Sequence, residues 1–289
     1  IEVIQVSGWH AGGIDSNYPS FSEPEPRLGS REDFAAAIEE CQKMGVNVLI
    51  WTNANQMNLE TDWYQRELHE YAIKNPYGNP QMPLGFGFDS LLHLMGYTVP
   101  RMVSGNLAHP QFRQIITGEW EKVHALGANA FLIDKVLSGE PHHLDFNPDV
   151  PGNTASSAHQ SLLDTVAEFS RRLKADGTPV ALETGWDRMM PHCTALYSRY
   201  FGQDHLPVQE VVFPEVKPSC CLTGDFDFGL VNKCLRFGHI IVIEGINKVG
   251  SIADFPYLQP YVKEAIRLRR ELADNIWWSC LIEQNIAAV

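Results

Sequence analysis

Short apolar runs alternate along the chain with longer stretches in which apolar residues recur at helical spacing. In residues 31–44, for example, Phe34, Ile38 and Cys41 fall on one helical face, and Ser30 can cap the start. The same two patterns predict strands at 3–6, 46–51, 101–103, 130–133, 179–182, 211–213 and 240–243. They predict further helices at 111–126, 155–175, 227–237 and 260–274.

This strand-then-helix order predicts an α/β fold, a (β/α)8 TIM-like barrel with a helical and irregular insertion around residues 54–100. About seven strands precede the closing helix, and the missing one lies in 54–100, in 188–207 or outside this chain. A doubly wound sheet is the main alternative, but the segment SGWHAGGIDSNYP after the first strand lacks a glycine-rich phosphate loop. We therefore expect residues 1–289 to form one catalytic barrel domain. We expect this domain to be a piece excised from a longer protein.

Composition and charge limit the classes of molecule that this chain is expected to bind. The 289 residues carry 22 Lys and Arg against 35 Asp and Glu, a formal net charge of −13. An acidic surface disfavours nucleic acid and anionic membranes, and no apolar run approaches the ~18 residues of a membrane span. The six cysteines form no CxxC pair and are interpreted as structural thiols. The start at Ile1 favours a secreted or periplasmic, processed protein over other locations, and the oligomeric state stays open.

Four acidic residues directly follow apolar runs: Asp134, Glu183, Glu215 and Glu244. In a barrel, the carboxyl ends of all strands open on one face, where active sites lie. Burial and mutual repulsion would push the pKa values of such carboxyls apart, giving one ionised and one protonated group. For any single residue, capping a helix or pairing with a cation is an equally good interpretation.

Aromatic and amide residues lie beside these acids. Trp faces can stack on sugar rings, and Asn and Asp can pair with hydroxyl groups. The candidate substrate-binding residues are Trp9, His10, Asp15, Trp51, Asn53, Asn55, Lys135, Trp186, Asp187 and Glu244. A single Trp at a strand end is more often part of the core, but Trp beside Asn and acid at three strand ends favours a carbohydrate site.

Other catalytic patterns are absent from the sequence. His10, His192 and His239 show no metal-ligand spacing, and there is no GxSxG nucleophile motif. We expect neither a metal nor any other cofactor. Lys135 follows Asp134, so proton transfer or Schiff-base chemistry by this lysine is an alternative.

The segments GWHAGGIDSNYP, VNVLIWTNAN, NAFLIDKV and PVALETGWD resemble the catalytic barrels of endo-α-N-acetylgalactosaminidases and, more distantly, α-galactosidases and family 31 α-glucosidases. The resemblance implies that Asp134 is the nucleophile, as the acid ending the fourth strand. It implies Glu183 as acid/base by comparison with the galactosaminidases, or Glu215 by comparison with the α-galactosidases.

We therefore expect a glycosidase of carbohydrate metabolism that uses two carboxylates, with retention at the anomeric carbon and 5–6 Å between Asp134 and Glu183. Asp15, Asn53, Trp186 and Asp187 would shape the sugar subsite. Two alternatives stay open: a barrel lyase or isomerase that uses Lys135 and the acids, and a glycan-binding barrel without turnover.

Overall fold

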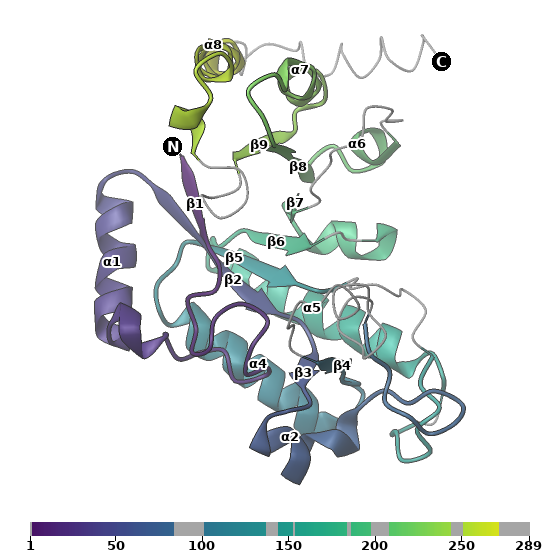
Figure 1. The fold of residues 1–289 in the computed structure, drawn as a ribbon. Coiled ribbons are helices and arrows are strands. Elements are labelled where there is room, and N and C mark those ends of the chain that lie inside the picture. The colour runs from purple at the N-terminus through teal and green to yellow at the C-terminus, as the bar shows by residue number, and fades with distance from the viewer. Residues whose placement is uncertain are drawn as a thin grey trace. The chain divides into compact units, whose positions relative to one another are not determined.

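The computed structural model describes residues 2–83, 101–136, 144–152, 154–183, 186–197, 208–243 and 251–271. They belong to two compact units, Ile1–Cys193 and Thr194–Val289. Each unit combines parallel strands with helices (Figure 1). The single domain expected over residues 1–289 stays a prediction.

The first unit is built on four parallel strands. They are β1 (Val3–Val6), β2 (Asn47–Asn53), β5 (Ala130–Asp134) and β6 (Val180–Glu183), hydrogen-bonded in that order. Asn53 pairs in register with Asp134, and Ile133 with Leu182, so these strands end at one common edge. The acids predicted to follow two apolar runs are the last residues of β5 and β6.

Three long helices of this unit match the sequence prediction. They are α1 (Arg31–Lys43), α4 (Pro110–His124) and α5 (Ser157–Ala175). Ser30 caps α1 by accepting the backbone N–H of Asp33, as its sequence position indicates. Phe169 of α5 lies against Trp120 of α4 and Phe131 of β5, with ring centroids 4.9 and 5.2 Å away. These rings pack α4 and α5 together against the sheet.

A long excursion separates β2 from β5 in sequence, although the two strands are direct neighbours in the sheet. It contains β3 (Gln56–Asn58), α2 (Asp62–Arg66), the 3-10 helix η2 (Leu68–Tyr71) and β4 (Met102–Ser104). Asn55 and Gly105 close its base: Asn55 Nδ2 donates to the Gly105 carbonyl at 2.7 Å, and Gly105 N donates to the Asn55 carbonyl at 2.9 Å. The helical pieces expected here are therefore present in the described part.

The strand predicted at 101–103 exists, but its place in the fold differs from the expectation. It is β4, which pairs antiparallel with β3 in a separate two-stranded sheet. Because β2 pairs directly with β5, Asp134 ends the third strand of the parallel sheet of this unit rather than the fourth.

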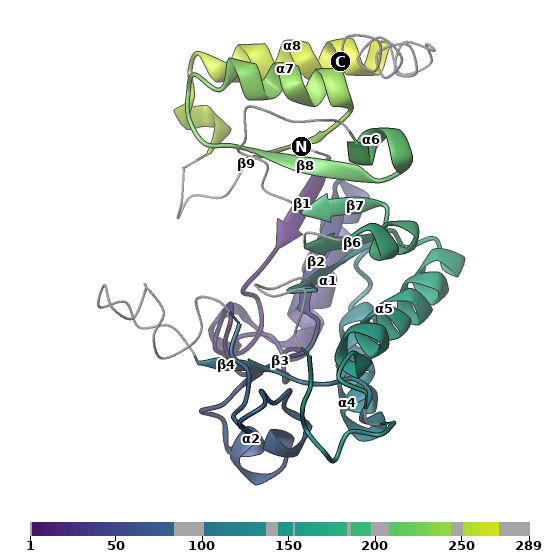
Figure 2. The ribbon, with the colours of Figure 1, turned by 90° about the vertical axis from the view of Figure 1, so that its right-hand side faces the viewer.

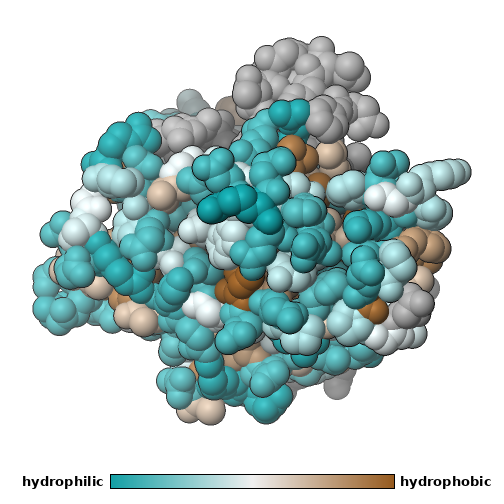
Figure 3. All heavy atoms as spheres, turned by 90° about the horizontal axis from the view of Figure 1, so that it is seen from below, coloured by the Kyte–Doolittle hydropathy of each residue, from teal (hydrophilic) through white to brown (hydrophobic). Residues whose placement is uncertain are grey.

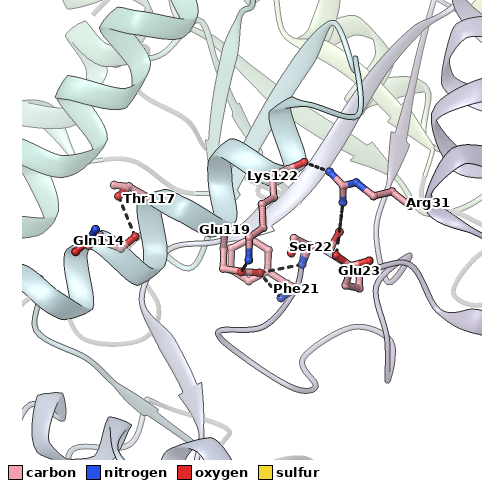
Figure 4. A network of polar contacts seen from close by, with 8 residues as sticks. All are labelled: Phe21, Ser22, Glu23, Arg31, Gln114, Thr117, Glu119 and Lys122. Atoms are coloured by element: carbon pink, nitrogen blue, oxygen red, sulfur yellow. Dashed lines mark hydrogen bonds and ion pairs between the residues drawn. The ribbon is translucent and has the colours of Figure 1, made fainter.

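The connection between β1 and α1, residues 7–29 with the 3-10 helix η1 (Pro26–Leu28), is fastened to α4 (Figure 4). The buried carboxylate of Glu119 accepts the backbone N–H groups of Phe21 at 3.2 Å and Ser22 at 3.1 Å. Arg31 donates to the Ser22 carbonyl at 2.6 Å and to a backbone carbonyl of α4. This anchorage holds the segment that carries three of the candidate site residues.

The second unit is a smaller layer of strands and helices. Its parallel strands are β7 (Ala195–Tyr197), β8 (Lys217–Leu222) and β9 (Ile240–Ile243). Its helices are α6 (Val208–Val212), α7 (Phe228–Phe237), the 3-10 helix η4 (Ile252–Asp254) and α8 (Leu258–Glu271). Helices α7 and α8 lie side by side over β8 and β9 (Figure 2). Leu222, Val231 and Leu258 are central to the core beneath them.

One predicted strand of this unit is wrong, and two real strands were not predicted. The apolar residues of 211–213 belong to the end of α6 and the turn after it. Strand β7 falls in 188–207, one of the two segments expected to hide a strand, whereas β8 begins with Lys217 and Pro218 and lacks an apolar pattern at its start. Glu215 therefore precedes a strand instead of following one.

The surface is largely polar. The face in Figure 3 is mostly hydrophilic, and hydrophobic side chains appear singly or in small groups. Among the described residues, no helix combines the length and the apolar character needed to cross a membrane.

Candidate active site

Two carboxyl groups meet at the common edge of β5 and β6. Asp134 is the last residue of β5, and Glu183 is the last residue of β6. Asp134 is only 3% exposed. The expected separation of 5–6 Å between the two carboxyl groups stays a prediction.

Lys135 places a positive charge against this pair. Its backbone has a φ of +59°, a left-handed conformation that ends β5 sharply. The backbone N–H donates to Glu183 Oε2 at 2.8 Å, while Nζ lies 3.1 Å from Asp134 Oδ2 and 2.7 Å from Asp15 Oδ1. Because its backbone turns, one residue contacts both carboxyl groups.

The pKa values of these groups reflect burial and charge. Burial, together with the charge and hydrogen bond of Glu183, raises the pKa of Asp134 to about 8, although Lys135 opposes the shift. Burial alone would lower the pKa of Lys135, but Asp134 and Asp15 outweigh it and raise that pKa. At neutral pH the site therefore holds the ammonium of Lys135 and a protonated Asp134.

Stacked rings lie beside the charged groups. The His10 ring is stacked against Tyr18, at 5.5 Å between centroids, and against Trp51, at 5.9 Å. Lys135 Nζ lies 5.9 Å from the Trp51 ring centroid, a cation–π distance. Burial lowers the pKa of His10 to about 4, so this imidazole is neutral and cannot compete for the carboxylates at neutral pH.

Two of the predicted sugar-stacking residues serve the core instead. Trp9 is buried, stacks on Phe34 and donates its indole N–H to the Trp51 carbonyl at 3.0 Å. Trp51 is also buried, although its face meets Lys135 and His10. Both residues are buried in the core next to the site, as a Trp at the end of a strand often is.

The side-chain amides of Asn53 and Asn55 differ in whether a hydrogen-bond donor remains for a ligand. Asn55 donates through Nδ2 to the Gly105 carbonyl, so its side chain closes the base of the excursion after β2. Asn53 accepts the Gln56 N–H through Oδ1 at 2.8 Å, whereas its buried Nδ2 has no hydrogen-bond partner among the described residues. Since Asn53 is the register partner of Asp134, it stays the better candidate for the site.

The remaining candidates make other contacts, are exposed, or lie outside the described residues. Trp186 precedes the 3-10 helix η3 (Asp187–His192), and its ring meets the edge of the His159 ring at 3.7 Å. Asp187 is exposed and accepts the Arg188 N–H. Glu215 is exposed at the amino end of β8 in the second unit, which removes the positional argument for it as acid/base. Glu244 lies outside the described residues.

Tyr18 is a site residue that sequence reasoning missed. It is fully buried, its hydroxyl accepts the Asp15 N–H at 3.1 Å, and it lies 3.4 Å from Asp15 Oδ1. Burial and the charges of Asp15 and Asp134 raise the pKa of its phenol. The sequence feature that could have identified Tyr18 as a candidate is its position three residues after Asp15 in the segment GGIDSNYP. Within the described ranges, no group of three or more His, Cys, Asp or Glu residues has the arrangement of a metal site.

No protein-family model and no curated protein matches the sequence. Solved structures do match the fold. An α-N-acetylgalactosaminidase from Bifidobacterium bifidum is 14% identical over 85% of this chain and 38% of its own, with a TM-score of 0.65. A GH31 family sulfoquinovosidase from E. rectale is 12% identical over 98% and 44%, with a TM-score of 0.66. An α-galactosidase from Thermus thermophilus is 10% identical over 90% and 58%, with a TM-score of 0.60.

These comparisons confirm the fold expected from the sequence. The chain has the TIM-like barrel fold of glycoside hydrolase catalytic domains. The resemblance to galactosaminidase, α-galactosidase and family 31 barrels is therefore confirmed at the level of fold. The chain spans about two fifths of the length of the first solved structures that it matches.

Proposed function

We propose that this chain is a glycosidase that hydrolyses O-glycosidic bonds with a pair of carboxyl groups, Asp134 and Glu183. The observation that carries the proposal is the placement of Asp134 and Glu183 at the ends of the paired strands β5 and β6, where Lys135 contacts both carboxyl groups. Glycoside hydrolysis needs one ionised and one protonated carboxyl on opposite sides of the bond that breaks. The structural neighbours, all named as glycosidases, support the same reaction class.

In the retaining mechanism that we favour, Asp134 attacks the anomeric carbon, and Glu183 protonates the leaving oxygen and then activates water. Lys135 favours the ionised form of Asp134, because its ammonium lies 3.1 Å from Oδ2. The mechanism requires Asp134 to be ionised and Glu183 to carry the proton of the general acid. It also requires about 5 Å between the two carboxyl groups.

The lyase or isomerase alternative requires a neutral lysine. Lys135 is buried beside Asp134, as that alternative expected, with only 8% of its surface exposed. However, Asp15 and Asp134 raise its pKa, so the amine is protonated and is a poor base or Schiff-base nucleophile. The ion pairs therefore favour an electrostatic role for Lys135 in hydrolysis.

The test is turnover of aryl glycosides of galactose, N-acetylgalactosamine, glucose and sulfoquinovose in both anomers. Hydrolysis that is lost in Asp134→Asn supports the proposal. Glu183→Ala should slow substrates with poor leaving groups far more than activated ones, and azide should restore its rate by attacking the glycosyl intermediate. Glu215→Ala is the matched control and should retain wild-type rates.

Each opposite result has a defined meaning. Azide rescue of Glu215→Ala, but not of Glu183→Ala, moves the acid/base role to the second unit. An unsaturated sugar product supports the lyase, and glycan binding without turnover supports the binding barrel. Either of the last two results refutes the proposed hydrolysis.

A further inference from the structure

The ammonium of Lys135 is shared between two carboxyl groups that come from different parts of the first unit. Its Nζ lies 2.7 Å from Asp15 Oδ1 and 3.1 Å from Asp134 Oδ2. Asp134 ends β5, whereas Asp15 belongs to the connection between β1 and α1. The side chains of Lys135 and Asp134 are only 9% and 5% exposed, so water contributes little to neutralising the charge. The positive charge is therefore divided between the two carboxyl groups, and the shorter contact is with Asp15.

The carboxylate of Asp15 is held in place for this contact. Its backbone has a φ of +60°, and the Tyr18 hydroxyl accepts its N–H at 3.1 Å and donates to Oδ1 at 3.4 Å. Tyr18 has no exposed surface, and its ring lies against His10, Trp51 and Phe21. The position of the Asp15 carboxylate is therefore set by a packed part of the core.

The backbone of Lys135 is fixed as well. Its N–H donates to Glu183 Oε2 at 2.8 Å, and its φ of +59° is a conformation that few residues with a side chain adopt. From this fixed backbone the ammonium contacts Asp15 and Asp134 together. When one of the two carboxyl groups is removed, the other is the acceptor already in contact.

Few charges surround Asp134 in the described part of the chain. The titratable groups at the site are Lys135 and Glu183 at the strand ends, and His10, Asp15 and Tyr18 in the connection between β1 and α1. Burial lowers the pKa of His10 to about 4 and raises the pKa of Tyr18, so both rings are uncharged at neutral pH. Asn53, the register partner of Asp134 on β2, carries no charge. The contact that favours the carboxylate form of Asp134 is therefore the one with Lys135.

We propose that Asp15 is a positioning residue that draws the Lys135 ammonium away from Asp134 and thereby keeps Asp134 protonated up to a higher pH. The inference rests on the proposed function, in which Asp134 must be ionised to attack. Two effects of Asp15 act in the same direction. Its negative charge disfavours a second one nearby, and its ion pair with Lys135 weakens the attraction between the ammonium and the Asp134 carboxylate. Tyr18 acts through Asp15, because its hydroxyl fixes that carboxylate.

Two other interpretations of Asp15 predict different behaviour. A residue that only binds a sugar hydroxyl changes KM and leaves the titration of Asp134 in the free protein unchanged. A residue that only stabilises the fold changes the free energy of unfolding, again without a directed effect on that titration. The proposal instead gives opposite signs to the two partners of one ion pair. Asp15→Asn moves the ionisation of Asp134 to lower pH, whereas Lys135→Met moves it to higher pH.

The test is a titration of the full chain by ¹³C NMR, with aspartate labelled at the side-chain carboxyl. The signal that is missing in Asp134→Asn identifies Asp134. We expect Asp15→Asn to lower its midpoint by about one pH unit, which raises the ionised fraction below the midpoint about tenfold. Tyr18→Phe should give a smaller shift of the same sign. In the Asp15→Asn background it should give none, because its effect passes through Asp15.

Tyr64→Phe is the matched control. Tyr64 is a buried tyrosine of α2 whose ring lies against His69, and its variant should keep the wild-type midpoint. An unchanged or raised midpoint in Asp15→Asn overturns the proposal, and so does a further shift by Tyr18→Phe in the Asp15→Asn background. Circular dichroism establishes that each variant folds, and Asp15→Ser replaces an asparagine variant that does not.

The titration separates this inference from the proposed function because it needs no substrate. A protein that hydrolyses no glycoside refutes the proposed function, while the midpoint of Asp134 still decides the role of Asp15. On a glycoside that turns over, the rise of kcat/KM with pH should move to lower pH in Asp15→Asn by the same interval as the NMR midpoint. A change in KM alone, with the pH profile in place, contradicts the proposal.

Discussion

The Asp134→Asn variant offers a test of the buried carboxyl pair that does not depend on the substrate. The folded structure raises the pKa of Asp134 from 3.8 to about 8. A carboxyl with a raised pKa contributes stability that is fully present at low pH, below its unfolded pKa. That contribution is lost as the pH rises through the folded pKa. The wild-type protein should therefore lose stability between pH 5 and pH 8 through this one group.

The size of the effect follows from the shift. Each pKa unit corresponds to about 1.4 kcal/mol, so three pH units inside the shifted range give about 4 kcal/mol. Asparagine has no proton to lose, so the variant does not titrate at this position. Asp15 still pairs with Lys135 in the variant. The difference between variant and wild type should therefore change by about 4 kcal/mol in favour of the variant.

The assay is denaturant unfolding at several pH values from 5 to 8, analysed as the difference between Asp134→Asn and the wild type. In this difference, the contributions of all other titrating groups to the pH dependence cancel. Glu168→Gln is the control, because Glu168 is an exposed acid on α5 and its removal should leave the difference flat. A flat difference for Asp134→Asn as well would refute the raised pKa of Asp134.

Three further outcomes follow from the same structure. kcat/KM on any glycoside that turns over should rise as the pH approaches about 8, because Asp134 must be ionised to attack, and Lys135→Met should move that rise to higher pH, because Lys135 lowers the pKa of Asp134. Glu119→Ala should cost about 2–4 kcal/mol in denaturant unfolding, since two buried backbone N–H groups lose their acceptor. Gly105→Ala should cost about 2 kcal/mol or more, because its Cβ would lie 2.3 Å from Phe112 Cε1, and Phe112→Leu in the same chain should restore part of the loss.

Much of the fold could be predicted from periodicity. Helices α1, α4 and α5 have a clear apolar face, and β2 and β5 are continuous apolar runs, so each was predicted within a few residues. Strand β8 was missed because Lys217 and Pro218 open it, and its burial comes from packing against α7. The segment 211–213 was misassigned because short apolar runs suit a strand and a helix equally.

The candidate site could be predicted only in part. The placement of Asp134 and Glu183 at neighbouring strand ends follows from the order of strand and helix. The contact of Lys135 with both carboxyl groups does not, because it depends on the left-handed backbone of Lys135, a conformation that a lysine rarely adopts. The roles of Trp9 and Asn55 also depend on tertiary contacts that no local pattern encodes.

The reciprocal hydrogen bonds between Asn55 and Gly105 have a consequence for how such a chain can evolve. They join the two ends of a fifty-residue excursion directly beside β2. The geometry at the base of the excursion therefore does not depend on the residues between Asn55 and Gly105. The entropy of closing a loop grows only with the logarithm of its length, and doubling the excursion costs about 0.6 kcal/mol. Insertions and deletions between these two residues are therefore nearly neutral for the barrel. The segment can diversify among relatives while the strand ends that hold Asp134 and Glu183 keep their register.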